Sequence, residues 1–278
     1  MKNESKRSSE SWRCPGFLRV ISYPALDAPL VAASWWIIFA RAFGNSDWTV
    51  VRALFPAVWS IYLLDRIHDS KDHRGGPPLR KQFAVDRLRL LKVLAVTSAV
   101  WAIVESLSLS QKVWIQVGVL AGFTAGYFLL FRWKRQAVRF PCKETMIGVC
   151  FAAGVGVPFA SPIHPVKIGG LLVFGALCVV NCLLVSRAEA WYDRTTDPSA
   201  YFAGNNSSFP FRGILAAACV MAGILCLSGL HPVATMSLFA SSLLLFGVTL
   251  QPDNGLHIQE LADAALWLPG IAGAVLVM

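Results

Sequence analysis

The sequence predicts an all-α membrane protein, a polytopic bundle of nine transmembrane helices. Of its 278 residues, 55% are hydrophobic and 15% are charged, whereas a soluble domain carries about 25% charged residues. Long apolar runs recur along the chain without the alternation of polar and apolar residues that a transmembrane β-strand needs. We therefore expect one membrane domain, residues 24–278, after a cytoplasmic tail, residues 1–23.

The nine expected spans follow from the lengths of the apolar runs. A spanning helix needs about 20 mostly apolar residues, and short turns rich in Gly, Pro or Asn separate the runs. The spans are expected at 24–42, 49–65, 89–107, 112–131, 144–161, 167–190, 212–230, 233–250 and 260–278. Because equivalent polar motifs follow the second and sixth spans, we expect two four-helix halves with a ninth helix appended.

The basic residues give the orientation. Of the 25 Lys and Arg residues, 21 fall in the N-terminal tail or around the loops after spans 2, 4 and 6. The four on or near the other side are Arg41, Arg52, Lys112 and Lys167. Because cytoplasmic loops are enriched in Lys and Arg, the N-terminus is expected in the cytoplasm and the C-terminus on the opposite side. The same bias explains the net charge of +9, so no nucleic-acid partner is expected.

Two copies of the pattern Asp-Arg-x-x-Asp stand where apolar runs end. They occupy residues 65–69 and 193–197, and the second copy extends one turn upstream to Glu189. Acids four residues apart lie on one face of a helix, one turn apart. Because spans 2 and 6 both end on the cytoplasmic side, both acidic clusters are expected there. Either motif alone is commonly just interfacial charge, but two equivalent copies favour a shared site.

The acids predict a metal ion. Both clusters stand at helix C-termini, where the helix dipole favours cations over acids. Oxygen ligands without a set of Cys and His residues indicate Mg²⁺, with Mn²⁺ as the alternative, rather than Zn²⁺. The candidate ligands are Asp65, Asp69, Glu189, Asp193 and Asp197.

Magnesium bound by a few carboxylates keeps positions open for substrate phosphate. Basic residues near the motifs suit the remaining oxygens of a diphosphate. The expected partner is therefore an amphiphile whose charged head lies at the acids and whose hydrocarbon tail lies among the helices, beside membrane lipid. The basic candidates are Arg66, Lys71, Arg74, Lys143 and Arg194.

This pattern resembles the UbiA-type intramembrane prenyltransferases. Ile61-x-x-x-Asp65-x-x-x-Asp69 resembles the first aspartate-rich motif of that family, which usually begins with Asn. Glu189-x-x-x-Asp193-x-x-x-Asp197 resembles the second motif. The resemblance implies a nine-helix fold and an isoprenyl diphosphate held through Mg²⁺ by the catalytic acids. These acids are Asp65, Asp69, Glu189 and Asp193, with Lys71, Arg74 and Lys143 on the diphosphate.

The resemblance implies an enzyme that ionises the diphosphate and transfers the prenyl group to an aromatic or lipid acceptor. Tyr62 and Trp191 are aromatic candidates for stabilising the allylic cation. Asn181, two turns before Glu189, either contacts substrate or hydrogen-bonds to another helix. Because Ile61 replaces the usual Asn, two alternatives stay open. One is a terpene cyclase of the same family, which needs no acceptor, and the other is a non-catalytic paralogue or transporter.

Overall fold

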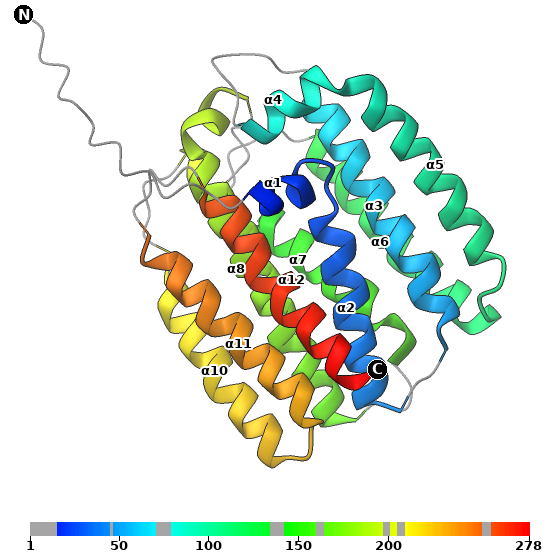
Figure 1. Ribbon diagram of the computed structural model, residues 1–278, viewed down its shortest axis with the longest axis vertical. Coiled ribbons are helices and arrows are strands. Elements are labelled where there is room, and N and C mark those ends of the chain that lie inside the picture. Colours follow the sequence, from blue (N-terminus) through cyan, green and yellow to red (C-terminus); the bar gives the residue numbers. More distant parts are fainter. Residues whose placement is uncertain are drawn as a thin grey trace, which may run out of the picture.

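The computed structural model describes residues 16–44, 47–70, 79–133, 142–159, 164–196, 201–204, 209–251 and 257–278. Every regular element in these ranges is a helix, which confirms the expected all-α class. The longer helices run side by side in one bundle (Figure 1).

Nine helices in the described ranges have 15 residues or more, and one lies at each stretch expected to span the membrane. They are α2 (Asp27–Ala42), α3 (Thr49–Asp69), α5 (Leu88–Ser106), α6 (Gln111–Trp133), α7 (Cys142–Gly156), α8 (Pro165–Thr196), α10 (Phe211–Leu227), α11 (Pro232–Thr249) and α12 (Ile258–Val277).

The turn between α10 and α11 shows how local sequence sets these boundaries. Gly229 takes φ = +90°, a left-handed conformation that ends α10, and Leu230 N donates to Leu225 O at 2.9 Å. Pro232 then occupies the first helical position, where its fixed φ suits a helix start. His231 Nδ1 caps the new helix by accepting from Val233 N at 3.3 Å.

Three of the described helices, α8, α11 and α12, are long and apolar enough to cross a membrane. A fourth span results if α1 (Gly16–Ser22) and α2, which meet at 87°, are taken together. The expected nine spans are therefore not confirmed as such. α7 and α10, for example, have 15 and 17 residues, fewer than the roughly 20 that a perpendicular span needs.

Large aromatic side chains fill the centre of the bundle, between α2, α8 and α12. Trp35 is fully buried and stacks on Phe174 of α8 at 4.7 Å between ring centroids. Its Nε1 also donates to Leu266 O of α12 at 3.0 Å, so one side chain joins three helices. Gly270 allows the close approach of α12 to α2, because a Cβ there would overlap Ser34 Oγ.

Four short helices complete the described elements: α1, α4 (Leu79–Asp86), α9 (Tyr201–Gly204) and the 3-10 helix η1 (Val157–Phe159). Figure 1 shows α1 and α4 at the same end of the bundle. Apolar contacts fix α4 there. Ala84 is buried in a small cluster with Leu63 of α3 and Leu91 of α5, and the Phe83 ring lies 5.3 Å from that of Tyr23.

Candidate functional site

The second acidic motif forms the last turns of α8. Glu189 and Asp193 are 5% and 6% exposed, and they share the face of α8 that turns into the protein. Trp191 and Arg194 are exposed on other faces of the helix. Asp197 lies outside the described residues. The predicted spacing on one face is therefore realised for two of the three acids.

Two basic residues of α4 neutralise these acids. Lys81 Nζ lies 3.1 Å from Glu189 Oε2 and 3.6 Å from Asp193 Oδ1. Arg80 Nη2 lies 3.2 Å from the other oxygen, Glu189 Oε1. Gln259 Nε2 of α12 also donates to Glu189 Oε1, at 2.6 Å. Both oxygens of Glu189 are thus occupied by nitrogen donors from two other helices.

The Lys81 ammonium group lies against one turn of α8. Its Nζ lies 4.5 Å from the centroid of the Tyr192 ring, within the range of cation–π attraction. Glu189, Tyr192 and Asp193 stand at i, i+3 and i+4, so all three reach the same point beside the helix. This one face of α8 therefore presents two carboxylates and an aromatic ring to a single cation.

Arg80 also connects α4 with α12. Its Nη1 lies 3.8 Å from Asp263 Oδ2, and Asn181 Nδ2 of α8 donates to Asp263 Oδ1 at 3.2 Å. Asn181 therefore makes the interhelical hydrogen bond, which was one of its two expected roles. Asp263 also interacts with Asp27, a buried acid at the start of α2.

Arg80 lies in α4, outside the apolar spans, and its charge is secured by its neighbours. Burial acts to lower the pKa of Arg80, but attraction to Glu189, followed by Asp263 and Asp27, raises that pKa above its ordinary value. The guanidinium group is therefore positive at every physiological pH.

The first motif contributes its arginine to this site. Arg66 is buried at the end of α3, its Nη2 lies 3.5 Å from Ser22 O, and the charges that act on it are those of Arg80, Asp27, Glu189 and Asp65. Asp65 lies on the exposed side of α3. Its carboxylate is among the charges that act on Arg66. The structure thus brings Arg66, rather than Asp65, toward the second motif.

The other predicted site residues either make no contact with Glu189 or Asp193 among the contacts given above, or fall outside the part of the chain that the structure describes. Ile61, where the family pattern has Asn, is 58% exposed. Tyr62 is half-buried, with its ring edge-on to Phe151 at 6.4 Å. Trp191 is exposed and contacts the Tyr192 ring at 5.7 Å. Lys71 and Arg74 lie outside the described residues, and the side chains of Asp69 and Lys143 are likewise not described.

The described acids do not fit a resident metal ion. Carboxylate oxygens are the ligands that Mg²⁺ prefers, but those of Glu189 already contact Lys81, Arg80 and Gln259. Among the residues that the structure describes, no group of three His, Cys, Asp or Glu side chains can hold a metal ion.

Four participants were not among the predicted site residues: Arg80, Lys81, Gln259 and Asp263. Arg80 and Lys81 stand in a basic loop that the positive-inside rule already explains, so their charge carried no separate signal. Gln259 and Asp263 did carry one. Together with Glu260 they are polar residues in the first turns of an otherwise apolar helix, where polar residues usually face the interior of the bundle, and Gln259 and Asp263 are one turn apart.

Glu144 is another buried acid, and it links three helices of the bundle. It lies in the first turn of α7 and accepts hydrogen bonds from Ser186 Oγ of α8 at 3.0 Å and from Tyr201 N of α9 at 2.9 Å. One carboxylate thus holds the short helix α9 against α7 and α8.

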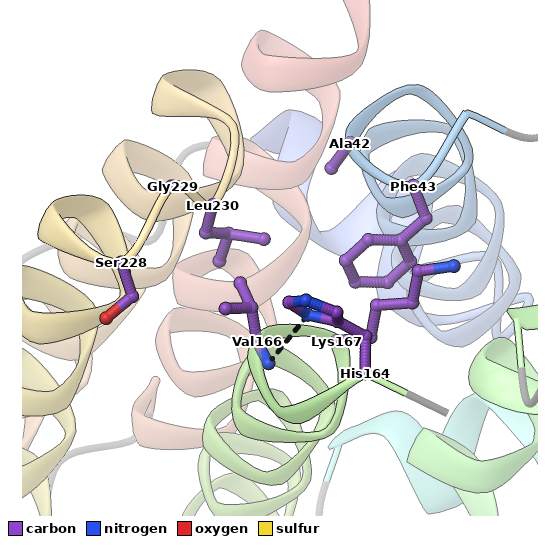
Figure 2. Close-up of a pocket in the computed structure, with 8 residues that line it drawn as sticks. All are labelled: Ala42, Phe43, His164, Val166, Lys167, Ser228, Gly229 and Leu230. Carbon is purple, nitrogen blue, oxygen red and sulfur yellow. Dashed lines mark hydrogen bonds between the residues drawn. The ribbon is translucent and has the colours of Figure 1, made fainter. Parts of the chain in front are cut away.

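A cavity of 260 Å³ lies at the opposite end of the bundle, between the end of α2, the start of α8 and the α10–α11 turn. Figure 2 shows Lys167 beside the Phe43 ring and the hydrogen bond from Val166 N to His164. Lys167 precedes Glu189 by 22 residues of α8, which corresponds to about 33 Å along the helix. This cavity therefore does not belong to the acidic site.

No family model, no curated protein and no solved structure matches the chain.

Proposed function

We propose that the chain is an intramembrane enzyme that ionises an isoprenyl diphosphate and transfers the prenyl group to an aromatic or lipid acceptor. One observation carries the proposal: Arg66 of the first motif and the acids Glu189 and Asp193 of the second are buried at one end of an apolar bundle, where Lys81 of α4 pairs with both acids. A charged site at the end of apolar helices suits a substrate with a charged head and a hydrocarbon tail.

Three cations, two of them buried and one half-buried, would bind the diphosphate. Arg66, Arg80 and Lys81 come from two different helices, and guanidinium groups bind phosphate oxygens in pairs. A diphosphate entering here would draw Arg80 and Lys81 away from Glu189 and Asp193. The hydrocarbon tail would then lie along α2, α8 and α12, where exclusion of water protects an allylic cation.

The proposal includes Mg²⁺, or Mn²⁺, and the support for this ion is the sequence pattern alone. The same holds for nine membrane spans arranged as two four-helix halves and a ninth helix, for a cytoplasmic N-terminus and for a C-terminus on the opposite side. Of the expected ligands, Asp65 is exposed, while Glu189 and Asp193 are engaged by α4.

A non-catalytic paralogue is the second candidate, and one observation favours it. In a metal-dependent enzyme the acids of the second motif bind the metal, whereas here Lys81 and Arg80 neutralise them. Such a protein would retain the bundle and its charged end without turning over a diphosphate.

Turnover by the purified full-length protein tests the proposal. The protein would be placed in lipid nanodiscs with Mg²⁺ and geranyl, farnesyl or geranylgeranyl diphosphate, with and without membrane lipid extract as a source of acceptor. We expect pyrophosphate release that depends on the extract and that Arg66→Gln abolishes. Release of a cyclic product without the extract would instead indicate a terpene cyclase. No release with any of the diphosphates would contradict the proposal and favour the non-catalytic paralogue.

The matched control for Arg66→Gln is Arg89→Gln. Arg89 is an exposed basic residue near the start of α5, at the same end of the bundle. Its replacement removes one positive charge without touching the site, so it should leave pyrophosphate release unchanged. Equal losses in the two variants would show that net charge, and not the position of Arg66, controls turnover.

A further inference from the structure

The acids of the second motif are arranged around cations that the protein itself supplies. Glu189 and Asp193 carry two negative charges between them, and Lys81 and Arg80 supply two positive charges at distances of 3.1–3.6 Å. All four side chains are at least partly shielded from water, so these interactions are stronger than at an exposed surface. The two acids thus have two cationic partners from α4, of which Arg80 also lies 3.8 Å from Asp263.

A divalent cation would compete directly with Lys81. Magnesium demands six oxygen ligands at about 2.1 Å in near-octahedral geometry. Lys81 Nζ contacts one oxygen of Glu189 and one of Asp193, so it occupies the position from which an ion would bridge the two carboxylates. An ion could bind there only after the ammonium group had left.

Lys81 and Arg80 are presented by a packed helix. Ala84, one turn further along α4, is 1% exposed and contacts the helix pair α3 and α5. The Tyr192 ring covers Lys81 from the side of α8. The two cations are therefore held at the acids by apolar contacts as well as by charge.

We propose that Lys81 and Arg80 are the resident counter-cations of Glu189 and Asp193, and that these two acids hold no divalent ion while α4 occupies this place. The site is then a protein-supplied ion-pair cluster, in contrast to the metal site that the motif pattern predicts. This proposal concerns binding alone and holds whether or not the chain turns over a diphosphate.

Mn²⁺ binding to the full-length protein tests this inference without any assay of turnover. The protein would be studied in nanodiscs of zwitterionic lipid, and bound Mn²⁺ would be measured by electron paramagnetic resonance. We expect Glu189→Gln to change the Mn²⁺ affinity of the otherwise unaltered protein by less than about twofold, because the acid does not hold the ion. We expect Lys81→Met to tighten Mn²⁺ binding by about tenfold or more, a difference of about 1.4 kcal/mol.

The combined variant shows whether the tighter Mn²⁺ binding of Lys81→Met occurs at Glu189. Adding Glu189→Gln to Lys81→Met should remove the tighter binding, and Lys92→Met, which removes an exposed lysine of α5, should leave the affinity unchanged. If a variant does not fold, Asp193→Asn and Lys81→Gln repeat the comparison. Weaker binding by more than twofold in Glu189→Gln alone would overturn the proposal. An unchanged affinity in Lys81→Met would do so as well.

Discussion

Lys81 Nζ lies 3.1 Å from Glu189 Oε2, so a short helix at the end of the bundle neutralises the acid that begins the second motif. Glu189 would otherwise be a buried carboxylate without a counter-charge, and such a group is costly. The ion pair explains how the acids can lie inside the protein. It also makes the position of α4 depend on α8.

This pair should show strong energetic coupling. Removing one partner of a buried ion pair leaves an uncompensated charge, so Lys81→Met alone should lower the free energy of unfolding by about 3 kcal/mol. Combining it with Glu189→Met should cost about 1–3 kcal/mol less than the sum of the two single variants. Unfolding by sodium dodecyl sulfate in mixed micelles measures all three. Additive effects would show that the two side chains do not interact.

The contribution of Arg80 to stability should not depend on pH near neutrality. Attraction to Glu189 raises the pKa of Arg80 against the effect of burial. A base with a raised pKa stabilises the folded state fully below its unfolded pKa, and that stabilisation is lost only as pH rises through the folded pKa. The difference in unfolding free energy between the unaltered protein and Arg80→Gln should therefore stay constant from about pH 6.5 to about pH 8.5. A difference that shrinks with rising pH would contradict this assignment.

Close contact between α2 and α12 should make Gly270 intolerant of a side chain. A Cβ at this position would overlap Ser34 Oγ and lie 3.1 Å from Trp35 Nε1. We expect Gly270→Ala to lower the free energy of unfolding by about 1–3 kcal/mol. Gly223→Ala in α10 is the control, because nothing lies within 4 Å of a Cβ there. The control should be neutral or stabilising by up to about 1 kcal/mol, and equal losses at both sites would contradict the packing.

Glu144 should protect the start of α9 from solvent. The carboxylate accepts from Tyr201 N, and a hydrogen bond to a charged group contributes about 1.5–3 kcal/mol. Glu144→Ala should therefore speed hydrogen exchange at the Tyr201 amide by about tenfold or more. Ser186→Ala removes the other donor to Glu144 and leaves this bond in place, so exchange at Tyr201 should change little. Mass spectrometry of exchanged peptides gives both rates.

The sequence predicted the helices well because their signal is local. Apolar runs bounded by turns such as Gly229–Pro232 set the helix positions, and the i, i+4 spacing placed Glu189 and Asp193 on one face of α8. The number of membrane spans was harder to predict from the sequence. Run length indicates a helix, but α7 is too short to cross a membrane upright.

The partners of the acids could not be predicted from the sequence, because they depend on long-range packing. Lys81 contacts Glu189 from a helix, α4, that also packs through Ala84 against Leu63 of α3 and Leu91 of α5. The first motif shows the same limit. Asp65 and Arg66 are neighbours in the sequence, and the rotation of α3 alone determines that the arginine faces inward and the aspartate outward.

Cross-linking of α4 to α8 in native membranes tests the central claim most directly. In a background with the seven native cysteines replaced by alanine, Lys81→Cys would be combined with Glu189→Cys and treated with a short bifunctional thiol reagent. The ion-pair geometry predicts efficient cross-linking of this pair and little for Lys92→Cys with Glu189→Cys. Equal yields for the two pairs, or no cross-link at position 81, would contradict the placement of α4 over the acids of α8.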